Sequence, residues 1–290
     1  MRILICSDGT APADNATHLA GLLGESCQVN ITLLGIEEDP RDKEPLRAAL
    51  EKEADSIRAR GLSAEIVVRS GDPIRQIFEQ TNSVKYDLAV IGARGKGPSG
   101  LYWRSQKTYE LVKSIEPPVL VAPGPCDQLK RFLVCTGGKQ YIENTVALTV
   151  ELAKCAGASV TLLHVMAEPP AMYADLVQLE EDVEQLMASG SELGRNLRAQ
   201  KEKIEKLGVP VEVRVRHGMV LDQVFQEVRE GNYDLIATGS SRARGMLRHY
   251  IMGDLTRSIL NHANIPVLVA RSGAMPPRNF FRSIKRLFAS

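Results

Sequence analysis

Short apolar runs alternate with amphipathic stretches along most of the chain. The first run, Ile3 to Cys6, contains no polar residue, which is typical of a strand that is covered on both faces. The stretch from Leu46 to Arg60 instead carries apolar residues at helical spacing, and Gly61 ends it. Continuous apolar strands separated by helices predict a doubly wound α/β fold, in which helices flank a parallel sheet.

Five apolar runs in each half of the chain have the length and composition of strands. The predicted strands lie at residues 3–6, 31–36, 65–69, 88–91 and 119–121, and then at 132–135, 160–165, 211–215, 235–238 and 267–269. A helical stretch from about Asn15 to Leu23 follows the first strand. We expect Asp72 to be the N-cap of another helix, because Pro73 follows it at the first helical position.

Three segments of the first half recur in the second half. Thr32–Ile36 returns as Thr161–Val165 after 161 − 32 = 129 residues, Tyr86–Gly92 as Tyr233–Gly239 after 147, and Pro118–Ala122 as Pro266–Ala270 after 148. A repeat of this length indicates a complete domain rather than a solenoid unit. The growing offset places 147 − 129 = 18 extra residues between the second and third strands of copy two, in a helical stretch that we expect to be broken near Gly190.

We therefore predict two tandem domains, at residues 1–126 and 127–273, followed by a C-terminal tail at 274–290. The join between the domains is short and rich in turn residues, so the domains are expected to pack against each other. In the tail, Phe280, Ile284 and Leu287 share one helical face, and basic residues lie on the other. This pattern predicts a basic amphipathic helix that packs on the protein itself or on a dimer partner, with weak contact to an anionic membrane surface as the alternative.

Composition and charge exclude several classes of function. The formal net charge of +1 argues against a general nucleic-acid-binding protein, and no apolar run has the ~20 residues of a membrane-spanning helix. The five cysteines include no close pair, so we expect reduced thiols and a cytoplasmic location. The histidines and cysteines lack metal-ligand spacing and no GxSxG turn is present, so neither a metal site nor enzymatic turnover is expected.

In an open parallel sheet, a ligand site lies beyond the carboxyl ends of the strands. In domain one this rule brings together Asp8-Gly9-Thr10 after the first strand, Ile36 at the end of the second, and Gly92 to Gly97 after the fourth. The glycine-rich turn is suited to present backbone N–H groups to phosphate, and Arg94 and Lys96 would add positive charge. It is not a Walker loop, because the chain contains no GxxxxGK[ST] motif.

The order of these motifs resembles the universal stress protein family. The resemblance covers residues 1 to about 272 and rests on Asp8-Gly9-Thr10, Leu33 to Ile36, Gly71-Asp72-Pro73 and Asp87 to Gly95 in copy one, and on Leu163-His164-Val165 and Ile265 to Val269 in copy two. It implies a five-stranded parallel sheet with four helices in each domain. It also implies pairing through the fifth strand, either between the two domains or in a homodimer, and a cytoplasmic role in stress responses with an unidentified protein client.

The resemblance further implies an ATP site in domain one. In the ATP-binding branch, the Asp after strand one and an apolar residue ending strand two hold the adenosine, and glycines after strand four approach the phosphates. The residues assigned to this site are Asp8, Gly9, Thr10, Ile36, Gly92, Arg94, Gly95 and Ser105. Ser105 and Gln106 stand where the family has glycine followed by Ser or Thr, and a side chain at the glycine position would crowd the phosphates.

Copy two departs further from the ATP-binding pattern. Its corresponding site residues are Val165, Gly239 and Gly253. Thr136 stands in place of the Asp, and Arg242 in place of the second glycine. Asp254 follows Gly253, and its carboxylate would repel a phosphate. We therefore expect a degenerate site in domain two.

Three functions remain open. The favoured one is a regulatory stress protein that binds an adenine nucleotide in domain one, with at most very slow hydrolysis. The second is a scaffold that has lost nucleotide binding, and the third and least favoured is a nucleotide-using transferase. Structural explanations also remain open: Arg94 and Lys96 as solvated surface, Asp8 as a cap of the first helix, and His164 as a core histidine.

Overall fold

The computed structural model describes residues 1–25, 27–39, 43–93, 106–136, 143–166, 183–242, 250–251 and 254–272. The strands of the first half are β1 (Arg2–Ser7), β2 (Asn30–Glu37), β3 (Ser63–Ser70), β4 (Leu88–Gly92) and β5 (Val119–Ala122). Those of the second half are β6 (Arg131–Thr136), β7 (Ser159–Met166), β8 (Val211–His217), β9 (Leu235–Arg242), β10 (Tyr250–Ile251) and β11 (Val267–Ser272). The helices are α1 (Ala11–Gly24), α2 (Lys43–Ala59), α3 (Pro73–Ser83) and α4 (Gln106–Ser114), then α5 (Glu143–Ala156), α7 (Val183–Ala188), α8 (Glu192–Lys206), α9 (Val220–Gly231) and α10 (Asp254–His262).

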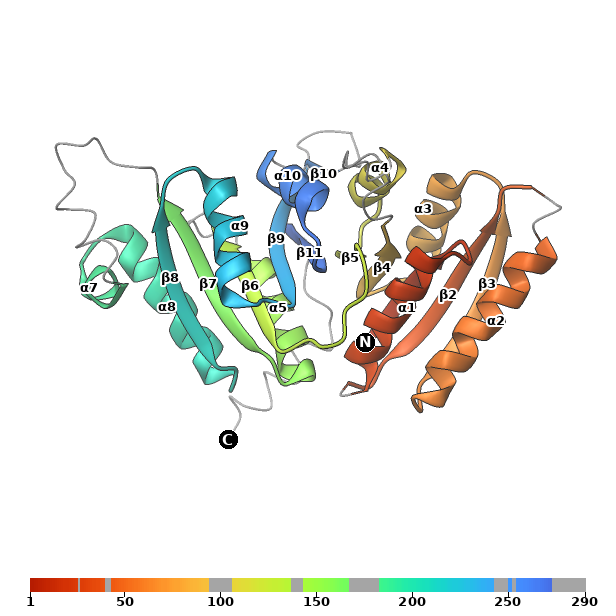
Figure 1. Cartoon of the computed structure of the whole chain (residues 1–290), viewed down its shortest axis with the longest axis horizontal. Coiled ribbons are helices and arrows are strands. Elements are labelled where there is room, and N and C mark those ends of the chain that lie inside the picture. The colour runs from red at the N-terminus through yellow and green to blue at the C-terminus, as the bar shows by residue number, and fades with distance from the viewer. Residues whose placement is uncertain are drawn as a thin grey trace.

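These strands form one sheet in the order β3-β2-β1-β4-β5-β11-β9-β6-β7-β8, with β10 paired to β9 (Figure 1). Within each half the main strands are parallel, and the second half repeats the order of the first in reverse. The order of strands reverses between β1 and β4, and correspondingly between β6 and β9. The predicted fold class is therefore confirmed: two tandem doubly wound α/β units share one continuous sheet.

Alternate residues of the strands face opposite layers of helices. Ile3 and Ile5 belong to the apolar cluster that contains α1 and α2, together with α5 and α8 of the second half. Leu4 belongs to the other cluster, which contains α3, α4, α9 and α10. Because successive side chains of a strand point to opposite faces, a run that is apolar at each position is buried on both sides. This explains why the strands lack the apolar–polar alternation of a half-exposed sheet.

The two halves join where β5 and β11 pair antiparallel, with Leu120 opposite Leu268. In Figure 1 these strands lie at the centre of the molecule, and β3 and β8 are the outer edge strands of the sheet. Arg271 of β11 is 1% exposed and crosses the junction. Its guanidinium donates to Ile115 O (3.0 Å) and Pro117 O (3.2 Å), and also to Val112 O. The carboxyl end of a helix carries unsatisfied carbonyls and partial negative charge, so the guanidinium of domain two stabilises that end of α4 in domain one.

Several predicted boundaries differ from the structure. Helix α1 begins at Ala11, earlier than expected, because Pro12 lies in its first turn, where proline is tolerated. Strand β9 continues to Arg242 because Ser240 and Ser241 pair with a prolonged β11, and β10 adds a short antiparallel partner. The helical insertion is interrupted as predicted, since α7 ends at Ala188 and α8 begins at Glu192.

Among the described helices, none is both long and apolar enough to cross a membrane. The predicted amphipathic tail at residues 274–290 lies outside the described residues, so its packing remains a prediction.

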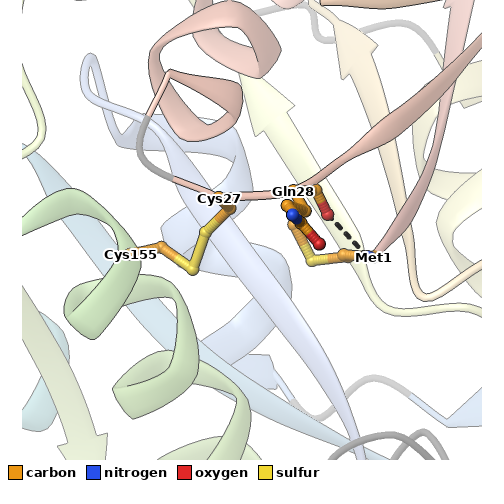
Figure 2. Close-up of a disulfide and its surroundings, with 4 residues drawn as sticks. All are labelled: Met1, Cys27, Gln28 and Cys155. Atoms are coloured by element: carbon orange, nitrogen blue, oxygen red, sulfur yellow. Dashed lines mark hydrogen bonds between the residues drawn. A yellow bond between two sulfur atoms is a disulfide. The ribbon is translucent and has the colours of Figure 1, made fainter.

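The expectation of reduced thiols is wrong for two of the five cysteines, because Cys27 and Cys155 form a disulfide with Cα atoms 5.4 Å apart. Figure 2 shows Cys27 in the connection from α1 to β2, beside the hydrogen bond from the Met1 ammonium to Gln28 O (2.9 Å), and Cys155 on α5. The pair was missed because the two cysteines are 128 residues apart and belong to different domains. The bridge therefore fastens the two domains to each other covalently. Cys6, Cys126 and Cys135 are free.

Reduction of this disulfide is expected to lower thermal stability. Closing a loop of 128 residues reduces the entropy of the unfolded chain and so raises its free energy by about 5 kcal/mol in the chain-entropy model. Melting curves with and without dithiothreitol measure the effect: the wild type should lose several degrees on reduction, and Cys27→Ser should melt low in both conditions. Cys126→Ser is the matched control and should keep the full response to reductant. Identical wild-type curves in the two conditions would contradict the stabilising role.

The helices that follow the third strand of each domain start differently. In domain one, Asp72 is the N-cap of α3 as predicted, and its carboxylate accepts a hydrogen bond from Arg75 N at 2.9 Å. In domain two the equivalent N-cap is Met219, which makes no side-chain cap hydrogen bond and is 75% exposed. Helix α9 therefore leaves backbone N–H groups at its start without the side-chain acceptor that α3 has.

Met219→Asp should stabilise domain two by about 1 kcal/mol, because it supplies the missing acceptor at a position that buries little apolar surface. Asp72→Ala is the reciprocal change and should destabilise domain one by a similar amount. Chemical denaturation of both variants tests the pair. The interpretation fails if Met219→Asp is neutral or destabilising while Asp72→Ala shows the expected loss.

Candidate functional site

A cavity of about 410 Å³ opens at the carboxyl ends of β1, β2 and β4, where the strand order of domain one reverses. Helices α3 and α4 form its outer wall. Its lining residues are Cys6, Ser7, Asp8, Pro12, Ala13, Leu34, Ile36, Glu38, Pro73, Ile74, Ile77, Ile91, Gly92, Thr108 and Leu111. A second hollow of about 280 Å³ adjoins it beneath α2 and shares Asp8, Ile36 and Glu38. Apolar walls with a few polar groups at a strand-order switch are typical of small-molecule sites.

The turn from Ser7 to Thr10 forms the floor of the cavity. Asp8 Oδ1 accepts hydrogen bonds from the backbone N (3.1 Å) and the hydroxyl of Thr10. The N-cap position of α1 is Thr10, without a side-chain cap bond, so Asp8 orients the turn and does not cap the helix. Its carboxylate is exposed at the cavity, with acceptor capacity left for a ligand.

Two glycines make this close packing possible. Gly9 has φ of +71°, and a Cβ there would lie 2.8 Å from Ala49 Cβ on α2. Gly92 ends β4, and a Cβ there would lie 2.0 Å from Pro12 O. Larger residues at either position would push α2 or α1 away from the strand ends. The predicted residues Asp8, Gly9, Ile36 and Gly92 thus converge, although the two glycines shape the backbone of the site.

A buried polar group supports the turn from below. Glu53 of α2 accepts hydrogen bonds from Ser7 Oγ at 2.6 Å and from Thr17 Oγ1 at 2.8 Å. Burial raises the pKa of Glu53, and the charges of Asp14 and Asp8 add to the effect. Sequence reasoning missed Glu53, but a signal existed: position 53 lies on the apolar face of the helix that Leu50 and Ile57 define.

Cys6 lines the cavity, but its thiol is poorly suited to act as a nucleophile. Burial raises the pKa of its thiol to about 12, so the reactive thiolate is scarce at neutral pH. The equivalent Cys135 in domain two has its pKa raised to about 12 by the same cause. Both sulfurs therefore contribute packing at the ends of β1 and β6. Among the described residues, no group of three or more His, Cys, Asp or Glu is placed to hold a metal ion.

Part of the predicted phosphate-binding segment falls outside the structure described above. Arg94, Gly95 and Ser105 of domain one, and Gly253 of domain two, lie outside the described residues. Their assignment to a ligand site remains a prediction.

Domain two differs from domain one at several described positions of the site. Thr136 is the last residue of β6 and corresponds to Ser7, so the expectation that it replaces the Asp is wrong by one position. Gly239 was expected at a strand end, but it lies within β9 opposite Ala270, because β9 continues for three more residues. Val165 of β7 is half-buried, as Ile36 is.

His164 stands in domain two where domain one has Gly35 (35 + 129 = 164). Its Nδ1 donates to Thr136 O at 2.9 Å, and burial lowers the pKa of the imidazole. A side chain in this place is incompatible with the packing of domain one, where a Cβ on Gly35 would lie 2.5 Å from Leu50. His164 is thus a hydrogen-bonded structural residue that fills the end of the strand.

A third cavity, of about 330 Å³, lies at the outer edge of domain two beside His217 and Arg214. Buried Glu227 accepts hydrogen bonds there from Arg216 Nε (2.6 Å) and Tyr233 Oη (2.7 Å). Domain one repeats this arrangement with a neutral residue: Arg69 Nε donates to Gln80 Oε1 at 3.0 Å, and Gln80 Nε2 donates to Tyr86 Oη at 2.8 Å. Because both domains use this position to fix a helix on the edge strand, we interpret the cluster as structural.

Comparison with known proteins identifies the family. The model of the universal stress protein family matches residues 1–123 and again 128–271, so the chain belongs to the universal stress protein family as a tandem member. No curated protein matches the chain in sequence.

Two solved structures are similar over nearly the whole chain, and a third is similar over less than half of it. One is a universal stress protein from Archaeoglobus fulgidus DSM 4304, with 18% identity, 94% of this chain and 98% of that chain covered, and a TM-score of 0.72. Another is described as a putative universal stress protein from Pseudomonas aeruginosa UCBPP-PA14, with 14% identity, coverage of 100% and 98%, and a TM-score of 0.65. A universal stress protein solved in complex with cAMP is similar over 42% of this chain and 96% of its own, with 21% identity and a TM-score of 0.37.

Proposed function

We propose that this chain is a stress-response regulatory protein that binds ATP or another adenine nucleotide in domain one and acts without catalytic turnover. The observation that carries the proposal is the cavity at the strand-order switch, which joins the Asp8 carboxylate to apolar walls. Apolar side chains such as Ile36, Ile77 and Leu111 line the cavity and are suited to contact the faces of a planar base. A carboxylate such as Asp8 accepts hydrogen bonds from ribose hydroxyls or an exocyclic amine.

The charges at the cavity suggest an orientation for the nucleotide. Asp8 and Glu38 are acidic, and like charges repel phosphate. We therefore infer that the nucleoside lies toward β1 and β2 and the phosphates toward the segment after β4, which contains Arg94 and Lys96 in the sequence. Gly92, where that segment begins, is placed at the cavity.

A scaffold role is the second candidate, and one observation favours it for domain two. Strand β9 runs on past Gly239 and pairs with β10, which puts strand structure where domain one ends its fourth strand. We therefore propose one nucleotide site per chain and a degenerate second domain that supports the first. Consistent with the family, we also infer a cytoplasmic setting, where the Cys27–Cys155 disulfide would be subject to reduction by cellular thiols.

Matched substitutions in the two domains test this proposal. Ile36→Glu places a carboxylate in the cavity of domain one, and Val165→Glu makes the same change at the corresponding half-buried position of domain two. Isothermal titration with ATP should show saturable binding to the wild type and to Val165→Glu, and at least tenfold weaker binding to Ile36→Glu. Equal loss in both variants would contradict a site confined to domain one. Failure of the wild type to bind ATP, ADP, AMP or cAMP would favour the scaffold.

A further inference from the structure

Glu53 ties three elements together beneath the candidate site. It lies on α2 and is 4% exposed. One carboxylate oxygen accepts from Ser7 Oγ of β1 at 2.6 Å, and the other accepts from Thr17 Oγ1 of α1 at 2.8 Å. Each hydroxyl donates its single proton to the carboxylate, which fits an ionised acceptor.

The hydrogen bonds continue from Glu53 to the backbone of the turn. Because the Ser7 hydroxyl donates to Glu53, its oxygen is left to accept, and it accepts from Gly9 N at 3.0 Å. Gly9 immediately follows Asp8, a polar residue that lines the cavity. One hydroxyl therefore links the buried carboxylate to the turn that presents Asp8.

Domain two provides an internal comparison. The equivalent of Glu53 is Gln200, since 53 + 147 = 200 and the same offset relates Leu50 to Leu197 and Ile57 to Ile204 on α2 and α8. The hydroxyl of Thr17 is also lost there, because Val146 occupies the corresponding place on α5 (17 + 129 = 146). Among the described residues, no donor reaches the buried Oε1 of Gln200. Domain two, in which we expect a degenerate site, thus lacks both the buried carboxylate and the hydrogen bonds that it accepts in domain one.

Folding disfavours the ionised form of Glu53 relative to its protonated form. Burial raises the pKa of Glu53, so the folded state binds its proton more tightly than the unfolded state does. Stability is then highest below the ordinary value of 4.5 and declines as pH rises from there through the raised pKa. A buried carboxyl whose ionised form is disfavoured by folding, and which supports a turn at a candidate ligand cavity, is a candidate for a functional role.

We propose that Glu53 is a positioning residue that holds the Ser7–Thr10 turn in its ligand-binding conformation, and that protonation of Glu53 loosens the turn and weakens binding. The effect of protonation on binding rests on the nucleotide site proposed above, whereas the positioning role concerns the protein alone. The other polar and charged groups that bear on Glu53 are Ser7 from β1, Asp8 from the turn, and Asp14 and Thr17 from α1.

Amide hydrogen exchange of Gly9, followed by NMR on the full chain without ligand, tests the positioning role. Glu53→Ala and Ser7→Ala should each speed exchange of the Gly9 amide at least tenfold, because each breaks the connection at a different atom. Glu53→Gln retains one oxygen that can accept from Ser7 but replaces the other with a donor, as protonation would, so its exchange should lie between those of the wild type and Glu53→Ala. Gln200→Ala is the matched control in domain two and should leave Gly9 unchanged. Exchange within twofold of the wild type in both Glu53→Ala and Ser7→Ala would overturn the proposal.

The pH profile of ATP affinity tests the link to binding. Glu53→Gln cannot titrate, so the ratio of wild-type to Glu53→Gln affinity cancels the titration of ATP itself. This ratio should rise with pH from about one near pH 4.5 to severalfold near pH 8. A flat ratio with ATP bound by both proteins would overturn the proton link. If the wild type binds no nucleotide, the proposed function and the proton link both fail, while the Gly9 exchange still decides the positioning role.

Discussion

Strands β5 and β11 lie at the inner edges of the two halves, and their antiparallel pairing leaves neither edge open. The pairing brings Arg271 against the last carbonyls of α4, which would otherwise end in an apolar junction without donors. Thr108 and Leu111 of that helix line the cavity of domain one. The last strand of the second domain thus holds one wall of the site in the first. The disulfide between Cys27 and Cys155 fastens the same two domains through the connection after α1 and the end of α5.

The two halves share a fold but differ at the strand ends, where the candidate ligand site of domain one lies. Domain one uses Gly9 and Gly35 to bring α2 close to the strand ends, and a buried carboxylate supports the turn that carries Asp8. Domain two fills the corresponding space with His164 and extends β9 beyond Gly239. The apolar core is common to the two halves despite these changes, since each of its two layers contains residues from both halves. These differences are the basis for proposing a single ligand site, in domain one.

Much of the fold could be predicted from the sequence, because strands buried on both faces and an internal repeat leave few alternatives. The cap at Asp72 and the interruption near Gly190 could also be predicted, because capping and helix-breaking residues mark them locally. That Asp8, Ile36 and Gly92 would lie close together at one edge of the sheet followed from the rule that ligands bind at strand ends, and all three line the candidate cavity. Features that depend on distant residues were missed: the Cys27–Cys155 disulfide and the hydrogen bonds from Ser7 and Thr17 to Glu53. Pairings of this kind are set by the packing of helices, which the local pattern does not encode.

The central claim is that the duplicated fold carries a single nucleotide site. Native mass spectrometry of the intact chain with increasing ATP measures the number of bound molecules directly. The account predicts that binding saturates at one ATP per chain, and that Ile36→Glu removes this adduct. Saturation at two ATP molecules per chain would contradict the assignment of domain two as degenerate, and the absence of any specific adduct would contradict the nucleotide site itself.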